Sequence, residues 1–412
     1  MEHLRASEAL RVILESITLQ GVETAALSRS LGRVLAKDVC ANRDLPPYDV
    51  SAMDGFAVRS ADISSTPAKL KIIEDIKAGD MPGKIVQAGQ CARIMTGAPV
   101  PQGADAVVRV EDTQELSGND VLIGVTVKRG KDVRPQGENM RGSDVVLKAG
   151  TEIIPGVIGV LATVKAAQVE VYRRPRVAIL STGNELEGIK EPVDPNKIPD
   201  SNTYALMAQV QALGIEPVLL GIARDDPKEL EDYLRHGLEY EVLLVSGGTS
   251  VGVHDYVRPT IEMLGVQMKF WRVSIRPGHP LAFGSTNKSI VFGLPGNPVS
   301  SMVCFEEFVL PCLRQMMGNP RLYRRTVMAH MAHAIKIRPG RTEFVRVQLT
   351  HGDAGYIASS TGTQSSGVLL SMAKADALLV IPSDSSGFEA GAQVTVQLLD
   401  GAEFQNEIGF RE

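Results

Sequence analysis

Residues 241–252, EVLLVSGGTSVG, join an uninterrupted apolar run to a loop rich in glycine, serine and threonine. Such a run is typical of a strand that is buried on both faces, as in a parallel sheet. Further strand-like runs lie within 177–180, 216–226 and 289–294, and helix-like segments lie at 201–214 and 227–239. This alternation predicts an α/β domain built on a doubly wound parallel sheet, with helices on both faces.

The loops that follow these strands are the candidate ligand-binding segments. Sheets of this kind bind ligands outside the carboxyl ends of their strands, because the loops meet there. The loops in question are STGNEL (181–186), ARDD (223–226), SGGTSVGVHD (246–255) and GLPGNP (293–298). We therefore expect the four loops to share one edge of the sheet.

The rest of the chain has a different character. The 412 residues are enough for roughly two to four domains. Residues 1–40 are predicted to be helical, and short strands between Gly/Pro turns predict β-rich units before and after the α/β region. We divide the chain into a linking domain (1–45 and 146–174), a β-rich arm (46–145), the α/β domain (175–318) and a C-terminal β-barrel (319–412).

Composition excludes several classes of protein. The net charge is −5 and aromatic residues are only 5%, which argues against a general nucleic-acid binder. The longest apolar stretch, IIPGVIGVLATV, is too short to span a bilayer, and the first residues lack the apolar core of a signal peptide. Cysteines at 40, 91, 304 and 312 match neither a zinc nor a disulfide pattern. We expect reduced thiols, with Cys304 and Cys312 in the core, and a cytoplasmic protein.

The glycine-rich loop is the first candidate for chemistry. Gly247 and Gly248 would let backbone N–H groups approach an anion closely, and the hydroxyls of Ser246 and Ser250 add donors. A tight strand-to-helix turn would need the same glycines. Residues 248–252 also fit the G-x-S-x-G pattern of serine hydrolases, although no clear partner acid follows.

Acidic residues recur where the strands end. Glu185, Asp225, Asp226 and Asp255 all fall in these loops, and convergent carboxylates suit Mg²⁺, which prefers oxygen ligands. One of them could instead act as a base on water. Asp226, directly before Pro227, is also well placed to cap a helix.

Cationic residues and a second turn complete the set. Arg272, Arg276 and His279 in WRVSIRPGHP are candidates for a local anion site. In GLPGNP, the segment Pro295, Gly296, Asn297 and Pro298 precedes a helix, whose first N–H groups can face an anion. No G-x-G-x-x-G fingerprint or P-loop is present, so NAD-dependent oxidoreductases and P-loop NTPases lose their main support.

Together these motifs resemble a known family. PPYDVSAMDGFAVR, RIMTGAPVPQGADAVV, GENM, STGNEL, DSN, RDD, SGGTSVGVHDY, RPGHP and GLPGNPVS are similar, in the same order, to segments of the molybdopterin molybdenumtransferases, which include MoeA and the C-terminal domain of gephyrin. The resemblance covers nearly the whole chain. It implies four domains and an elongated homodimer whose active cleft lies between the α/β domain of one subunit and the β-rich arm of the other.

The resemblance also implies particular residues. The family's functional positions fall on Asp54, Thr96, Asp144, Glu185, Asp225, Asp255, Pro295 and Pro298. Where the family commonly has K-P-G-K-P, this chain has Arg276-Pro277-Gly278-His279-Pro280. Arg keeps a permanent charge, whereas His can be neutral near pH 7, so the affinity for the oxyanion is expected to differ. The segment GENMRGSD is shorter than the family pattern, and a loose Q-x-S pattern remains near Ser366 and Ser371.

The implied activity is insertion of molybdate into adenylylated molybdopterin, with Mg²⁺-dependent hydrolysis and release of AMP. Asp225, Glu185 and Asp255 are then the expected metal ligands, and Asp225, Asp54, Glu185 and Thr96 the expected catalytic residues. Two alternatives stay open: a molybdopterin adenylyltransferase, which resembles residues 175–318 alone and is also a possible partner, and a non-catalytic scaffold like gephyrin.

Overall fold

The computed structural model describes residues 4–248, 256–352 and 355–399. Its central sheet has the strand order β16-β13-β17-β21-β20-β18. The strands are β13 (Val177–Thr182), β16 (Val218–Ala223), β17 (Val242–Ser246), β18 (Gln267–Phe270), β20 (Ala282–Ser285) and β21 (Ile290–Leu294). The predicted parallel sheet is present in β16, β13, β17 and β21, and it continues into two antiparallel strands, β20 and β18.

Alternate residues of these strands enter two separate cores. Val177 and Ile179 of β13 pack with α1 (Ala6–Glu15), α3 (Ser201–Ala212), α6 (Pro298–Cys304) and α7 (Leu310–Met316). Ala178 and Leu180 pack on the other face with α4 (Pro227–Gly237) and α5 (Val257–Met263). Both faces are therefore covered, which explains why the strands are continuous apolar runs rather than alternating ones.

Helix capping and the cysteines follow the sequence. Asp226 accepts hydrogen bonds from the backbone N–H groups of Lys228 (3.0 Å) and Glu229 (2.8 Å), which confirms its predicted capping role. Cys304 and Cys312 are buried free thiols, and burial raises the pKa of both. In the described part of the chain, no helix is long and apolar enough to cross a membrane.

The N-terminal region differs from the prediction. Of the predicted helical stretch 1–40, the structure describes residues 4–40, and among these only α1, residues 6–15, is an α-helix; β1 (Val22–Ala26), a 3₁₀ turn (Leu27–Arg29) and β2 (Val39–Cys40) follow. Helix α1 packs on the core of the α/β unit, and the carbonyl oxygen of Leu14 accepts a hydrogen bond from Gln315. The β-branched residues Val22 and Thr24 favour a strand. This strand, β1, pairs with β12 (Gln168–Tyr172), which lies about 145 residues further along the chain.

The linking unit is small. Strand β1 pairs with β12, β2 pairs with β11 (Val145–Leu147), and α2 (Pro155–Thr163) packs on the same core. Two chain segments therefore run through this unit to the β-rich arm and back.

The arm contains a six-stranded sheet in the order β7-β4-β6-β5-β9-β8. Its strands are β4 (Gly55–Val58), β5 (Ala68–Ile76), β6 (Gln90–Ile94), β7 (Ala106–Arg109), β8 (Thr113–Leu116) and β9 (Asp120–Ile123). Gly55 is required at the start of β4, because a Cβ there would overlap the carbonyl oxygen of Val108 on the neighbouring strand. A short antiparallel pair of strands, β3 (Val50–Ser51) and β10 (Val133–Arg134), precedes and follows this sheet along the chain.

The C-terminal unit is a closed five-stranded barrel, as the sequence predicts. Its strands are β22 (Thr326–Met331), β24 (Thr342–Gly352), β25 (Gly355–Ser360), β26 (Ala377–Ile381) and β28 (Gln393–Leu398), and the pairing of β24 with β26 closes the ring. Strand β19 (Ile275–Arg276) of the α/β unit pairs with β24 outside the barrel. This pairing fixes the barrel against the segment RPGHP.

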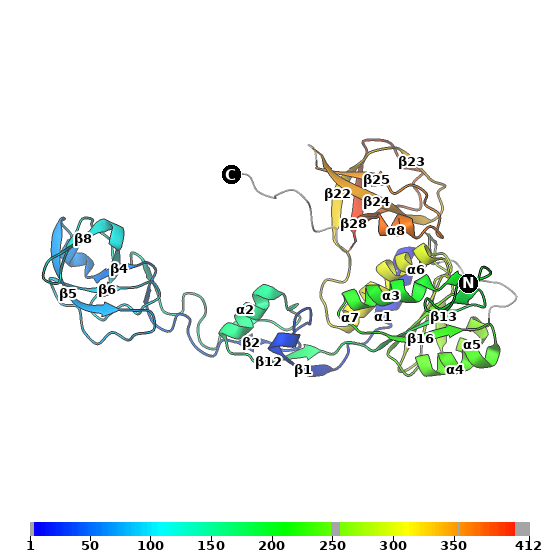
Figure 1. Ribbon diagram of the computed structural model, residues 1–412, viewed down its shortest axis with the longest axis horizontal. Helices are drawn as coiled ribbons and strands as arrows, with labels where there is room; N and C mark the ends of the chain where they lie inside the picture. The colour runs from blue at the N-terminus through cyan, green and yellow to red at the C-terminus, as the bar shows by residue number, and fades with distance from the viewer. Residues whose placement is uncertain (1–3, 249–255, 353–354, 400–412) are drawn as a thin grey trace.

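The molecule is long, with the arm at one end and the α/β unit and barrel at the other (Figure 1). The linking unit, with α2, β1 and β12, lies between them. The candidate site residues on the arm are therefore remote from the α/β unit of their own chain.

A buried carboxyl group helps to hold the barrel in place. Gln397 of β28 donates a hydrogen bond of 3.3 Å to Glu307, in the π-helical turn Phe305–Val309. Burial, with a smaller contribution from the neighbouring Glu306, raises the pKa of Glu307 to about 8, although Gln397 and Arg324 oppose the change. Glu307 is consequently neutral in the folded protein at neutral pH.

This carboxyl group predicts a pH dependence of stability. Between about pH 4.5 and about pH 8 the folded state keeps a proton that the unfolded chain has released, so the free energy of unfolding falls as the pH rises. In Glu307→Gln this contribution disappears. We expect urea denaturation across the window to give a shallower pH dependence for the variant; equal slopes would contradict the assignment.

Candidate functional site

The four parallel strands end at one edge of the sheet, and a cleft of about 730 Å³ lies there. Residues from all four loops line it: Gly183, Glu185, Asp225, Gly247, Gly248, Pro295, Gly296, Asn297 and Pro298. The structure thus brings together residues that are more than a hundred positions apart in the chain. Ser250 and Asp255 lie outside the described residues.

The two acidic loops are tied to each other. Asn184 N–H donates to Asp225 Oδ2 (3.3 Å), and Asp225 N–H donates to Asn184 Oδ1 (3.1 Å). Arg224 spans the same junction, with Nη1 donating to the carbonyl oxygens of Leu186 (2.7 Å) and Gly183 (3.4 Å). These contacts hold Glu185 and Asp225, both exposed, on one side of the cleft.

The carboxylates on this side of the sheet-edge cleft suit a hard cation. A group of three or more possible metal ligands is absent from the described residues, but Glu185 and Asp225 present two exposed carboxylates to one cleft. The third acid that lines the cleft, Asp200, is buried and caps α3 through Thr203. Mg²⁺ is often held by one or two carboxylates together with substrate phosphate oxygens, so the residues present fit it.

The opposite side of the cleft is built for close backbone approach. Gly247 and Gly248 have positive φ angles of 92° and 61°, and a Cβ at Gly247 would crowd the carbonyl oxygen of Thr182. Asn202 donates to both Ser246 Oγ and the Gly296 carbonyl oxygen at 2.8 Å, which connects two loops. Among described residues, Thr182 Oγ1 and Asn202 Oδ1 are buried without a hydrogen-bond partner. Such atoms are rare in folded proteins, and a polar ligand in this cleft would supply a partner for them, because both residues line it.

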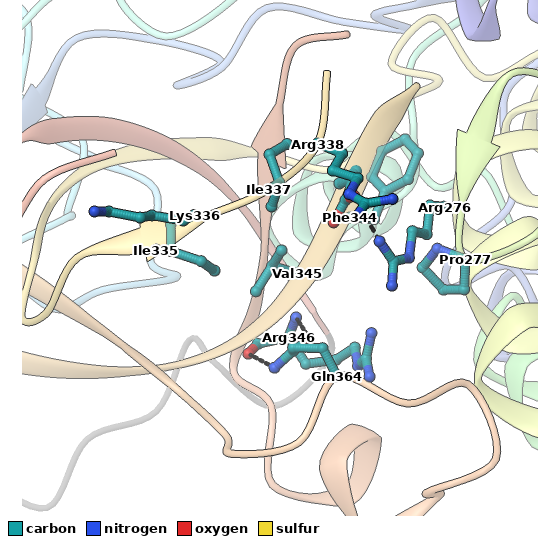
Figure 2. Close-up of a pocket in the computed structure, with 11 residues that line it drawn as sticks. Arg276, Pro277, Ile335, Lys336, Ile337, Arg338, Phe344, Val345, Arg346 and Gln364 are labelled. Atoms are coloured by element: carbon teal, nitrogen blue, oxygen red, sulfur yellow. Dashed lines mark hydrogen bonds and ion pairs between the residues drawn. The ribbon is translucent and has the colours of Figure 1, made fainter. Parts of the chain in front are cut away.

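A second, basic cleft of about 460 Å³ lies between the α/β unit and the barrel. Its charged lining residues are Arg276, Lys336, Arg338, Glu343 and Arg346. Figure 2 shows Arg276 and Arg338 near Phe344 and Pro277, with Arg346 beside Gln364; the Lys336 side chain extends away from them. Arg276 Nη1 also donates to Glu343 Oε1 at 3.2 Å.

Arg346 is the most unusual residue of this cleft. It is only 1% exposed, and its guanidinium donates to Ser371 Oγ and the Ser365 carbonyl oxygen, each at 3.2 Å. In the described part of the chain no carboxylate pairs with it, and burial lowers the pKa of the guanidinium without removing its charge. A buried cation without a counter-ion is costly and indicates an anionic ligand.

A third cleft, of about 600 Å³, adjoins both others. Arg276 and His279 line it together with Asn297, Ser300, Arg341 and Ser366. His279 Nδ1 lies 2.8 Å from the Val273 carbonyl oxygen, and Asn297 Nδ2 donates to Ser366 Oγ at 3.0 Å. Arg272 is half-buried and lines none of the three clefts described.

Asp54 and Thr96 meet on the arm. The backbone N–H and the hydroxyl of Thr96 both donate to Asp54 Oδ1 at 2.7 Å, and these hydrogen bonds hold the pKa of Asp54 below its usual range. The pair therefore presents a fixed negative charge to solvent. Asp144 lies in a turn directly before β11 of the linking unit, where it accepts a hydrogen bond from Arg141 N–H (2.9 Å), and it lines none of the three clefts described.

Several functional candidates were not found from the sequence. Arg346 lies within the strand sequence EFVRVQL, where a single cation among apolar residues was the available signal. Arg224 and Asn202 act through backbone and amide contacts that no local pattern reveals. The weak Q-x-S region proves to supply Gln364, Ser365, Ser366 and Ser371, which contact Arg346 and Asn297.

Fold and site define a multidomain α/β protein whose sheet-edge cleft and adjoining basic clefts suit a ligand with more than one anionic group. Family models agree with each part. The MoeA N-terminal region (domain I and II) matches residues 4–164, a probable molybdopterin binding domain matches 178–315, and the MoeA C-terminal region (domain IV) matches 328–399.

Relatives cover almost the whole chain. A molybdopterin molybdenumtransferase from Nostoc sp. is 37% identical over 387 residues, covering 92% of this chain and 88% of the relative. One from Staphylococcus aureus is 32% identical over 406 residues, covering 97% of each. The crystal structure of the molybdopterin biosynthesis MoeA protein from Pyrococcus horikoshii OT3 matches with a TM-score of 0.85 at 30% identity, covering 97% of this chain and 100% of that one. This chain belongs to the MoeA family of molybdopterin molybdenumtransferases.

Proposed function

We propose that this chain, in the cytoplasm, inserts molybdate into adenylylated molybdopterin and releases AMP. The observation that carries the proposal is that an acidic cleft and a mainly basic cleft both adjoin the third cleft, which connects them. One presents the carboxylates Glu185 and Asp225, and the other presents Arg276 and the buried Arg346. Hydrolysis of a phosphoanhydride and capture of a divalent oxyanion need these two environments side by side.

The acidic side of the sheet-edge cleft would serve hydrolysis. Glu185 and Asp225 would hold Mg²⁺, and the metal would neutralise charge that develops on the leaving phosphate. Water forms the new P–O bond, the bridging P–O bond breaks, and a proton is released. The N–H groups at Gly247 and Gly248 and at the start of α6 would orient the phosphates.

The basic clefts would hold molybdate. Arg276 and Arg346 supply donors in a forked geometry that suits oxyanions, and Ser300, Ser366 and His279 line the adjoining space. Asn297 and Pro280 line both the third cleft and the sheet-edge cleft. Molybdate held in the third cleft would therefore have a short path to a pterin bound in the sheet-edge cleft.

A complete site would need a second copy of the chain. The arm, which carries Asp54 and Thr96, lies at the far end of the molecule from the α/β unit, which carries Glu185 and Asp225 (Figure 1). We propose a homodimer in which the arm of one subunit reaches the sheet-edge cleft of the other. Asp54 would then add a permanent negative charge to the metal side of the cleft.

Release of AMP from adenylylated molybdopterin tests this function directly. The reaction is run with Mg²⁺ and molybdate, with tungstate in place of molybdate, and with no oxyanion. Oxyanion-dependent AMP release, with metal in the pterin product, is the expected result. ATP consumption would instead indicate an adenylyltransferase, and a folded dimer that releases no AMP would indicate a scaffold.

A further inference from the structure

Glu343 is the one carboxylate among the described residues that line the basic cleft. Four cationic side chains, Arg276, Lys336, Arg338 and Arg346, share that lining with it. Glu343 is only 8% exposed. A buried acid is an unexpected component of a site for a negatively charged ligand, because it repels that ligand.

The position of Glu343 is set by the backbone. Arg276 of β19 lies directly opposite Glu343 of β24 in the parallel pairing that joins the barrel to the α/β unit. The Arg276 side chain is 65% exposed, whereas that of Glu343 is 11% exposed, and 3.2 Å separates Arg276 Nη1 from Glu343 Oε1. The exposed Arg276 side chain is thus held by the buried Glu343.

We propose that Glu343 sets the oxyanion affinity of the basic cleft: it holds Arg276 in place and offsets one positive charge, so that the bound dianion can leave for the pterin. This inference rests on the proposed function. With Lys336 pointing away, Arg276, Arg338 and Arg346 together with Glu343 carry a net charge of about +2, which balances a dianion such as molybdate.

The charge of Glu343 and its contact with Arg276 can be separated by substitution. Glu343→Gln keeps an oxygen that accepts the hydrogen bond from Arg276 and removes the negative charge. We expect molybdate to bind on the order of tenfold more tightly, because one unit charge within several ångströms acts on a dianion in a partly buried site. Glu343→Asp keeps the charge and shortens the contact, so its affinity should not increase.

The experiment is equilibrium dialysis of molybdate against the full-length protein, at low and high ionic strength. Glu389→Gln is the matched control, since it removes the same charge from an exposed position on the barrel that lines no described cleft. Arg338→Gln changes the cleft charge in the opposite direction and should weaken binding by a comparable factor; being exposed, it remains usable if Glu343→Gln does not fold.

The outcomes separate the inference from the proposed function. Tighter binding to Glu343→Gln, with no change in Glu389→Gln, supports the inference. Equal or weaker binding to a folded Glu343→Gln overturns it, and so does an unaltered affinity in Arg338→Gln. If the wild-type protein binds no molybdate at all, the assignment of the cleft to the oxyanion fails as well.

Discussion

Replacing Asp225 with asparagine should reduce AMP release from adenylylated molybdopterin by about 10²–10³-fold, the scale of losing one electrostatic contact to a transition state. The side chain is exposed and lies in a loop, so folding should be unaffected. Asparagine keeps an oxygen that accepts the hydrogen bond from Asn184 N–H, so the junction of the two acidic loops is retained. What is removed is the negative charge that would hold Mg²⁺ beside the phosphoanhydride.

Asp226→Asn provides the control for this experiment. Asp226 is the adjacent acid, and asparagine caps helices as well as aspartate does, so α4 should stay intact. Both variants are assayed over a range of Mg²⁺ concentrations, and binding of the adenylate is measured separately. A wild-type rate in Asp225→Asn, with the adenylate bound, would remove Asp225 from the mechanism.

The α/β part of the site could be predicted because its geometry follows from topology. Parallel strands bring their carboxyl ends to one edge, so Glu185, Asp225, Gly247 and Pro295 had to be neighbours once the strands were recognised. The position of Asp226 directly before Pro227 was also sufficient to predict that Asp226 caps a helix. In each case the inference needed only residues within a few positions of a strand end.

Other parts depend on contacts between distant segments, which no local pattern contains. The stretch 22–26 becomes a strand because it pairs with residues 168–172, and its own propensity did not decide this. Arg346 is buried, and its guanidinium contacts Ser371 and Ser365, which lie about twenty residues further along the chain. The pairing of Arg276 with Glu343 likewise exists only because β19 joins β24.

The remoteness of the arm leads to the second large effect. Asp54→Asn should reduce AMP release by about a hundredfold or more, although the arm that carries Asp54 lies at the opposite end of the molecule from the α/β unit of the same chain (Figure 1). The Thr96 hydrogen bonds hold Asp54 ionised, so its contribution is a charge that asparagine cannot supply. Asp120→Asn removes the same charge from β9, which β6 and β5 separate from β4 in the same sheet, and it controls for damage to the arm.

Mixing the two inactive variants then shows where the arm acts. In a two-fold dimer with shared sites, a heterodimer of Asp54→Asn and Asp225→Asn places both substitutions in one site and leaves the other site intact. Random exchange makes half of the dimers heterodimers, so the mixture should recover about a quarter of the wild-type activity. If each site were formed within one chain, every site in the mixture would carry a substitution. Heterodimers demonstrated by native mass spectrometry but without activity would therefore exclude an arm that acts on the partner.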